Sequence, residues 1–400
     1  MSAGQQPRVR RRHVLFFGGF DPKGASWYHA LYQRHAALQA GVNGLPIEVG
    51  ARRRDASARQ YWSARGAPPG EEVCESCIEV VSWDATVRRH WPRHGLRLMA
   101  EMAVAYARVI GNGIPQLIKV GRIAPRTLFA MMYPLLFFVL GMAACLLVSV
   151  LGGWIAFALW GSTLVSIVVA ALLLSGCGWM MLRIERWLDT GLLARIYAFV
   201  ARYGVRGLPE LDRIVADAAA RIALLAREPD IDELLVVGYS VGSILATRAM
   251  ALALPALADR DGQCPQLALL TLGNCIPLLG LFPQALDYRR ELGALASSRI
   301  IRWVDVSSPT DWGSFALLNP IEVCEIEVTE KGSGWPLMTS PRFHTLFDSA
   351  SYRAMIGDKH RMHTQYLMAS EKPGRYDYFA ITAGPMSLRE RYARVRELSA

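Results

Sequence analysis

A long uncharged stretch in the first half of the chain restricts its fold more than any other feature. From Thr127 to Leu182, fifty-six consecutive residues include no Asp, Glu, Lys, Arg or His. A helix needs about 20 apolar residues to cross the hydrocarbon core of a bilayer. The glycine pair at 152–153 divides the stretch into two parts that are each long enough. We therefore expect a transmembrane hairpin of two helices, Leu128–Leu151 and Trp154–Leu182.

Basic residues flank the uncharged stretch on both sides. Arg122 and Arg126 precede it, Arg183 and Arg186 follow it, and the turn between the expected helices has no basic residue. Cytoplasmic flanks of membrane spans carry an excess of Lys and Arg. This pattern predicts an inner (plasma) membrane protein with two transmembrane helices, whose flanking regions and both termini are cytoplasmic. The net charge of +10 then indicates contact with the lipid bilayer rather than with nucleic acid.

Seven cysteines are scattered along the chain, and only Cys74 and Cys77 form a C-x-x-C pair. A structural zinc site needs four ligands, and no second pair with suitable spacing follows. We therefore expect unpaired thiols in a reducing compartment, with no metal and no cofactor.

The second half of the chain contains a strand, a tight turn and a helix in direct succession. Leu234–Val237 is a short, partly β-branched apolar run typical of a buried strand. The sequence Gly-Tyr-Ser-Val-Gly follows at 238–242, and a small-residue helix begins at Ser243. A bare G-x-S-x-G is weak in a glycine-rich chain, but this context favours a nucleophile at Ser240, whose Oγ the sharp turn lifts off the edge of the sheet. The N–H of Val241 would then face a developing oxyanion.

The segment VVGYSVGSILA resembles the serine esterase and lipase branch of the α/β-hydrolase superfamily. The resemblance implies an α/β fold with a mostly parallel sheet, into which the two-helix transmembrane hairpin is inserted. Residues 1–126 would form the N-terminal part of the hydrolase domain, 127–182 the hairpin, and 183–400 the C-terminal part with the nucleophile. It also implies a catalytic triad in the chain order Ser, acid, His, without a cofactor.

Other apolar runs predict the remaining strands of this sheet. They are His13–Phe17, Ile78–Ser82, Leu267–Leu272 and Ile300–Val306. The alternating run Ile321–Val328 could be the last strand or one arm of a hairpin. Residues 41–72 are rich in Gly, Pro and Arg and are interpreted as a surface loop.

The first strand runs into the turn GGFDPKG at 18–24. In α/β-hydrolases this place holds the second oxyanion donor, so the resemblance assigns that role to the N–H of Phe20 or its neighbour. An ordinary strand-to-helix turn is the alternative. GGFDP also resembles the opening of nucleotidyltransferases, but the H-x-G-H that should follow is absent, and the next histidine is His29.

The triad order places the acid and the base after Ser240, and the acid should lie just beyond the end of a strand, where WVDVSSPTDWGSF offers two aspartates. Asp305 lies inside a predicted strand, whereas Asp311 lies in the loop after it, where active-site loops belong, so we favour Asp311. The histidines are His344, His360 and His363. We favour His363, because a turn-like GDK precedes it and an apolar helix start follows it.

These patterns together predict a membrane-anchored serine hydrolase that cleaves carboxylic esters, including lipid esters, through an acyl-enzyme on Ser240. Two other hypotheses stay open. The chain could be a catalytically inactive membrane scaffold with a hydrolase fold, or a nucleotidyltransferase-like enzyme that uses the GGFDP turn. A histidine within hydrogen-bond distance of Ser240 separates the hydrolase hypothesis from these two alternatives. The sequence indicates no particular oligomeric state.

Overall fold

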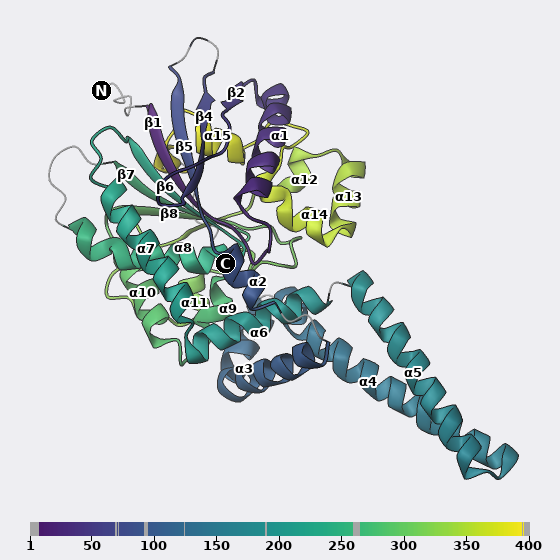
Figure 1. The fold of residues 1–400 in the computed structure, drawn as a ribbon. Helices are drawn as coiled ribbons and strands as arrows, with labels where there is room; N and C mark the ends of the chain where they lie inside the picture. Colours follow the sequence, from purple (N-terminus) through teal and green to yellow (C-terminus); the bar gives the residue numbers. More distant parts are fainter. Residues whose placement is uncertain are drawn as a thin grey trace. The chain divides into compact units, whose positions relative to one another are not determined.

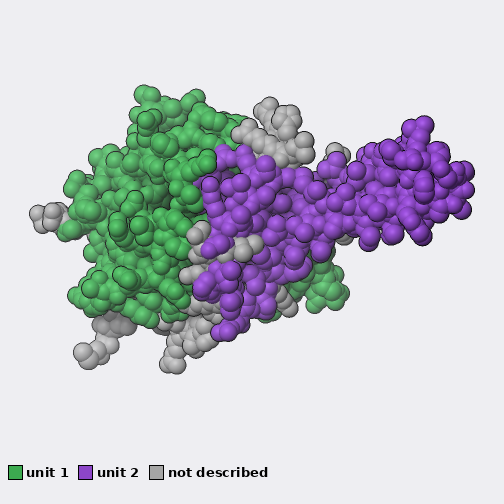
Figure 2. Space-filling model, turned by 90° about the horizontal axis from the view of Figure 1, so that it is seen from below, with its two compact units in different colours: residues 1–90, 203–400 green, residues 91–202 purple. Residues whose placement is uncertain are grey.

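The computed structural model describes residues 8–68, 70, 72–91, 95–123, 125–188, 190–258, 265–393 and 395. The chain divides into two compact units, which are coloured separately in Figure 2. Unit 1 comprises residues 1–90 and 203–400, and unit 2 comprises residues 91–202. Unit 2 is therefore inserted in the sequence of unit 1.

A single mixed sheet is the centre of unit 1 (Figure 1). Within the described residues its strands are β1 (Arg11–Phe17), β2 (Ile47–Val49), β3 (Arg53–Arg54), β4 (Gln60–Gly66), β5 (Cys74–Val81), β6 (Glu233–Tyr239), β7 (Gln266–Leu272), β8 (Ile301–Val306) and β9 (Leu337–Thr339). The order across the sheet is β2-β4-β5-β1-β6-β7-β8-β9, and β3 pairs with β4. In this order, the six neighbouring strands β5, β1, β6, β7, β8 and β9 run parallel to one another. Strand β4 pairs antiparallel with β5, and β2 and β3 pair antiparallel with β4. The chain is thus an α/β protein with a mostly parallel sheet.

Helices cover both faces of this sheet (Figure 1). In unit 1 they are α1 (Ala25–Asn43), α2 (Asp84–Arg89), α7 (Pro209–Leu225), α8 (Gly242–Ala258), α9 (Ile276–Gly280), α10 (Leu286–Ser297), α11 (Pro320–Val323), α12 (Phe343–Leu346), α13 (Ser349–Gly357), α14 (Lys359–Thr364), α15 (Tyr378–Ala383) and α16 (Leu388–Arg391), with a 3₁₀ turn η1 (Gln365–Leu367). Alternate residues of each strand point to opposite faces. Thus Val14 and Phe16 join the core shared with α1 and η1. Helices α7, α8 and α10 lie on the opposite side of the sheet from α1.

The five strands predicted around the nucleophile are present, with small shifts at their ends. Two other predictions were wrong. The segment 41–72 is not a loop, because it contains β2, β3 and β4, which extend the sheet beyond β5. Ile321–Val328 is not a strand. Asn319 caps α11 by accepting a hydrogen bond from the N–H of Ile321, Pro320 starts the helix, and Glu325 has a φ of +52°.

Unit 2 consists of long helices. These are α3 (Gly95–Ile123), α4 (Pro125–Trp160), α5 (Thr163–Leu188) and α6 (Thr190–Arg206), which continues into unit 1. Two segments, Thr127–Trp160 and Thr163–Glu185, are long and apolar enough to span a membrane.

The break between these two helices does not lie where the sequence indicated. Helix α4 continues through Gly152 and Gly153, and the chain turns at Gly161, whose φ is +62°. The glycine pair instead allows α5 to come close. A Cβ on Gly152 would lie 2.0 Å from a Leu173 methyl carbon, and Ser166 Oγ donates a hydrogen bond to the carbonyl of Gly153. Small residues serve this purpose in closely packed membrane helices.

The first third of α4 belongs to the core of unit 2. Tyr197 donates a hydrogen bond to the carbonyl of Ala130, and Phe138 packs with Met102 and Tyr106 of α3. Beyond Phe138 most large apolar side chains of α4 are exposed. They are Val139, Leu140, Met142, Leu146, Leu147, Val148, Val150, Leu151, Trp154, Ile155, Phe157, Leu159 and Trp160. The exposed apolar part of α4 is therefore 139–160, which at 1.5 Å per residue is about 33 Å long.

Candidate active site

The turn between β6 and α8 depends on its two glycines. A Cβ on Gly238 would lie 2.6 Å from the Cα of Ser243, and a Cβ on Gly242 would lie 2.3 Å from the carbonyl oxygen of Phe17. No side chain fits at either distance. The glycines thus let α8 start directly against the ends of β6 and β1, as the sequence predicted for this motif.

Ser240 occupies the apex of this turn with a φ of +55°. This left-handed conformation is strained for a residue other than glycine, and costs on the order of 1–3 kcal/mol. Hydrogen bonds hold it in place. The N–H of Ser240 donates to the carbonyl of Leu272 at 2.9 Å, and the hydroxyl of Ser243 donates to the carbonyl of Ser240 at 2.6 Å. Such strain at a serine is typical of a nucleophile turn.

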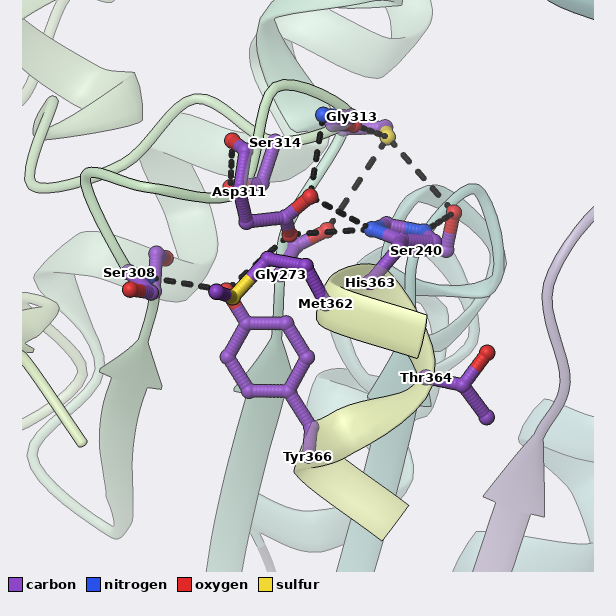
Figure 3. Close-up of polar contacts among 12 residues, drawn as sticks. Ser240, Gly273, Ser308, Asp311, Gly313, Ser314, Met362, His363, Thr364 and Tyr366 are labelled. Atoms are coloured by element: carbon purple, nitrogen blue, oxygen red, sulfur yellow. Dashed lines mark hydrogen bonds and ion pairs between the residues drawn. The ribbon is translucent and has the colours of Figure 1, made fainter. Parts of the chain in front are cut away.

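His363 reaches Ser240 from a distant part of the chain. Its Nε2 lies 2.8 Å from Ser240 Oγ (Figure 3). His363 is on the last turn of α14, which Asp358 caps by accepting a hydrogen bond from the N–H of Arg361. The hydroxyl of Tyr239 donates to the backbone carbonyl of His363 at 3.2 Å. The residue before Ser240 therefore contacts the helix that carries the imidazole.

Asp311 lies on the other side of the imidazole. His363 Nδ1 is 2.9 Å and 3.0 Å from the two carboxylate oxygens of Asp311. Asp311 is in the loop after β8, and its Oδ1 accepts a hydrogen bond from the N–H of Gly313 at 2.9 Å. A Cβ on Gly313 would lie 2.9 Å from His363 Nδ1, so the loop approaches the imidazole closely.

The charges of this pair stabilise each other. Burial alone raises the pKa of Asp311, but the neighbouring His363 and the hydrogen bonds from Gly313 and Tyr366 hold that pKa below its ordinary value. Burial lowers the pKa of His363, and the Asp311 carboxylate more than compensates, so the pKa of His363 lies above its ordinary value. Because Asp311 is ionised, the neutral imidazole carries its proton on Nδ1, and Nε2 accepts a hydrogen bond from the Ser240 hydroxyl.

The other acid candidate, Asp305, does not contact the imidazole. It lies within β8, fully buried, and accepts hydrogen bonds from the hydroxyls of Thr271 and Ser307. Burial without a cation raises its pKa to about 7. Asp305 therefore belongs to a buried polar network between β7 and β8.

The two other histidine candidates lie on the protein surface. His344 is exposed on α12 beside the ring of Tyr352, and His360 is exposed on α14, one turn before His363. The hydrogen bond to Ser240 Oγ comes from His363. The structure thus brings together Ser240, His363 and Asp311 out of the six residues considered for the triad.

The turn at 18–24 lies next to Ser240. A Cβ on Gly19 would be 3.2 Å from the Cβ of Ser240. The N–H of Gly19 donates to the hydroxyl of Tyr28, and Phe20, the next residue, is 5% exposed. Val241 directly precedes the first residue of α8, where backbone N–H groups have no intrahelical acceptor. The roles of Phe20 and Val241 as oxyanion donors stay predictions.

The same turn meets only part of what nucleotidyl transfer would need. That hypothesis requires a histidine and basic residues converging on GGFDP, with Ser240 distant from it. Arg88 does donate a hydrogen bond to the carbonyl of Pro22. His29 instead hydrogen-bonds to the carbonyl of Gly50, with its ring against Trp62, while Gly19 packs against Ser240.

Three residues of the site were missed in the sequence. The thiol of Cys275 lies 3.8 Å from Ser240 Oγ, and burial raises its pKa to about 12. Gly313 contacts His363, and the hydroxyl of Tyr366 donates to Asp311 Oδ2 at 3.0 Å. Cysteine and tyrosine of this kind occur in many buried cores, so neither stands out in a sequence.

The cysteine pair of β5 does not form a metal site. Cys74 and Cys77 are three residues apart on one strand, so their side chains point to opposite faces, and both are free thiols. Among the described residues, no group of three or more His, Cys, Asp or Glu side chains could hold a metal ion.

No family model, no curated protein and no solved structure matches this chain.

Proposed function

We propose that this protein is a membrane-anchored serine hydrolase of the α/β-hydrolase type that cleaves carboxylic esters. The observation that carries the proposal is the hydrogen-bonded chain from Ser240 Oγ through His363 to Asp311. A serine at a strained strand-to-helix turn, a base within 2.8 Å and a buried carboxylate on the far nitrogen are the parts that acyl transfer needs.

Acylation begins when Ser240 Oγ attacks the carbonyl carbon of the ester. The Oγ proton passes to His363 Nε2, and the carbonyl π electrons move onto the oxygen. Backbone N–H groups of Val241 and Phe20 would stabilise that oxyanion. When the intermediate collapses, the bond to the alcohol oxygen breaks, and the imidazolium gives its proton to the leaving alkoxide. The acyl group remains on Ser240.

Deacylation repeats the sequence with water. His363 Nε2 takes a proton from a water molecule while the water oxygen adds to the acyl carbon. The bond to Ser240 Oγ then breaks, and His363 returns its proton to that oxygen. Asp311 stays ionised in both halves, keeps the proton of the neutral imidazole on Nδ1, and stabilises the imidazolium.

The membrane anchor consists of the exposed apolar parts of α4 and α5, residues 139–182. Each is close to the length of about 20 residues that crosses a bilayer. Trp154 and Trp160 are exposed near the turn, and Arg183 lies 4.8 Å from the ring of Trp179 at the opposite end. Trp and Arg are favoured at the membrane surface. Since unit 1 flanks the insertion on both sides, both flanks lie on one side of the membrane, and their basic residues lead us to place that side in the cytoplasm. A lipid or another amphiphilic ester is the substrate class that suits an anchored enzyme.

A catalytically inactive scaffold would not need an ordered imidazole beside Ser240. Maintaining the left-handed conformation of Ser240 has a cost in stability on the order of 1–3 kcal/mol. This strain, together with an imidazole and a buried carboxylate aligned on Ser240 Oγ, favours turnover over a purely structural role.

The test is a kinetic comparison of purified variants on an activated short-chain ester. Ser240→Ala and His363→Ala should each lower kcat by several orders of magnitude, and the double variant should lose no more, because serine and base act as one unit. His360→Ala, which removes an exposed imidazole one turn away, is the matched control and should keep wild-type kcat. Full activity of Ser240→Ala would contradict the proposal.

A further inference from the structure

We propose that Tyr366 is a positioning residue that fixes the Asp311 carboxylate and thereby sets how strongly His363 holds a proton. This inference rests on the hydrolase function proposed above. It concerns a residue that the acyl-transfer steps themselves do not use.

The hydrogen bonds of Tyr366 have a defined direction. Tyr366 is on η1, three residues after His363, and is fully buried. Its hydroxyl accepts a hydrogen bond from the N–H of Ser308 at 2.8 Å and lies 3.0 Å from Asp311 Oδ2 (Figure 3). A backbone N–H can only donate, so the phenol donates its own proton to the carboxylate.

The phenol ring has little freedom to move. A Cβ on Gly273, which has a φ of +52°, would lie 2.7 Å from a carbon of the Tyr366 ring and 3.1 Å from Asp311 Oδ2. The same ring contacts the His363 imidazole edge-on, with centroids 6.4 Å apart. Tyr366 therefore touches both the acid and the base.

Three donors share the charge of Asp311. They are the Nδ1–H of His363, the N–H of Gly313 and the hydroxyl of Tyr366. Each donor disperses negative charge and so weakens the attraction of the carboxylate for an imidazolium. Without the Tyr366 hydroxyl, Asp311 would attract the proton on His363 more strongly. It would also be held less firmly.

Among the groups that contact this pair, only His363 and Asp311 themselves titrate in the relevant pH range; Asp305, whose pKa burial raises to about 7, is hydrogen-bonded to Thr271 and Ser307 instead. The neighbouring titratable groups are Tyr239 on β6, Cys275 after β7 and Tyr366 itself. Burial raises the pKa of Cys275 to about 12 and raises the pKa values of both tyrosines well above their ordinary value. All three therefore remain protonated donors while His363 changes its charge.

The test compares Tyr366→Phe with Tyr376→Phe. Tyr376 is also buried, and its hydroxyl donates at 2.5 Å to the backbone carbonyl of Tyr366, so its variant loses the same atom without touching Asp311. In Tyr366→Phe we expect kcat to fall about tenfold with unchanged KM. The acid limb of kcat/KM should move to higher pH. In Tyr376→Phe the limb should stay at the wild-type pH. Identical pH profiles of the two variants would overturn the inference.

A second variant preserves the shape of the site. A 3-fluorotyrosine at position 366 is a stronger hydrogen-bond donor than tyrosine, so it should move the acid limb to lower pH, opposite to Tyr366→Phe. An acid limb that stays in place, or that moves upward, would contradict the positioning role.

One measurement separates this inference from the proposed function. Titration of His363 can be followed by NMR in detergent micelles, with ring-labelled histidine and His363→Gln for assignment. If no ester is hydrolysed but the measured pKa of His363 is still higher in Tyr366→Phe than in the wild type, the hydrolase proposal fails and the positioning role stands. If hydrolysis depends on Ser240 but the titration is unchanged, the positioning role fails.

Discussion

Gly19 and Ser240 come from segments more than two hundred residues apart, yet a single methyl group on Gly19 would lie 3.2 Å from the Cβ of Ser240. The same methyl group would lie 3.4 Å from the ring of Tyr239. The turn after β1 is thus part of the wall around the nucleophile, and its glycine is required for space.

Gly19→Ala should therefore damage activity without unfolding the protein. The added carbon would displace Ser240 from His363 by a few tenths of an ångström, and small displacements of reacting groups cost up to about 10²-fold in rate. We expect kcat/KM to fall between about tenfold and a hundredfold. Gly41→Ala on α1 has open space around its Cβ and should keep full activity while stabilising the helix by about 0.5–1 kcal/mol. Equal activities of the two variants would show that Gly19 does not border the nucleophile.

Asp311→Asn should lower kcat by about 10⁴, as loss of the orienting carboxylate does in serine proteases. The pKa of His363 is held up by the Asp311 charge against the effect of burial. Removing the charge therefore lowers that pKa, and the acid limb of the residual activity should move to lower pH.

Asp358→Asn is the control for this variant. It removes a carboxylate from the N-cap of α14, the helix that carries His363, and asparagine is an equally good helix cap. Its pH profile should match that of the wild type. An acid limb that moves upward in Asp311→Asn would contradict the assigned roles.

Asp305→Asn should change how stability depends on pH. Burial raises the pKa of Asp305 to about 7, so between about pH 4 and pH 7 the folded state binds a proton that the unfolded state has released. Wild-type stability should consequently fall as the pH rises through this window. The loss has an upper bound of about 4 kcal/mol.

The asparagine has no such proton, so it should lack this loss. The stability of Asp305→Asn relative to the wild type should increase from pH 4 to pH 7 and then level off. Thermal unfolding of both proteins in detergent at several pH values measures this difference. A difference that is independent of pH would show that Asp305 titrates normally in the folded protein.

The membrane topology predicts which positions can be labelled from outside the cell. Ser162 lies in the turn between α4 and α5, so Ser162→Cys should react with a membrane-impermeant maleimide in intact cells. Ser57 is exposed in unit 1, and Ser57→Cys should react only after lysis. Labelling of the native cysteines is measured in parallel on the wild-type protein and gives the background. Labelling of Ser57→Cys in intact cells would overturn the assigned orientation.

Local patterns predicted the strands around the nucleophile well, because those strands are short apolar runs in a buried parallel sheet. The antiparallel edge was missed for a compositional reason. In β4, Trp62 and Ala64 are buried while Ser63 and Arg65 are exposed, which is a strand alternation. The surrounding arginines, glycines and prolines obscured it. Conversely, the glutamates at 322, 325 and 327 alternate with apolar residues in a pattern typical of a strand, although Asn319-Pro320 is a helix-start signal.

The site was predictable to the extent that its members follow strand ends. Asp311 was favoured over Asp305 because it lies beyond the end of β8, and the structure places it there. The choice of His363 depended on a weaker signal, because it lies on one of the short helices that follow β9 and not directly after a strand. Tyr366 and Gly313 act through contacts that form only when the loop after β8 meets η1. Such contacts leave no local pattern.

Labelling with a fluorophosphonate probe tests the central claim most directly, because the probe reacts only with an activated serine. The wild-type protein in membranes should become labelled, and peptide mass spectrometry should locate the probe on Ser240. Ser240→Ala should not be labelled, whereas Ser297→Ala, which removes a hydroxyl on α10, should be labelled like the wild type. Labelling of Ser240→Ala at the wild-type rate, or a wild-type protein that neither reacts with the probe nor hydrolyses any ester, would contradict the account.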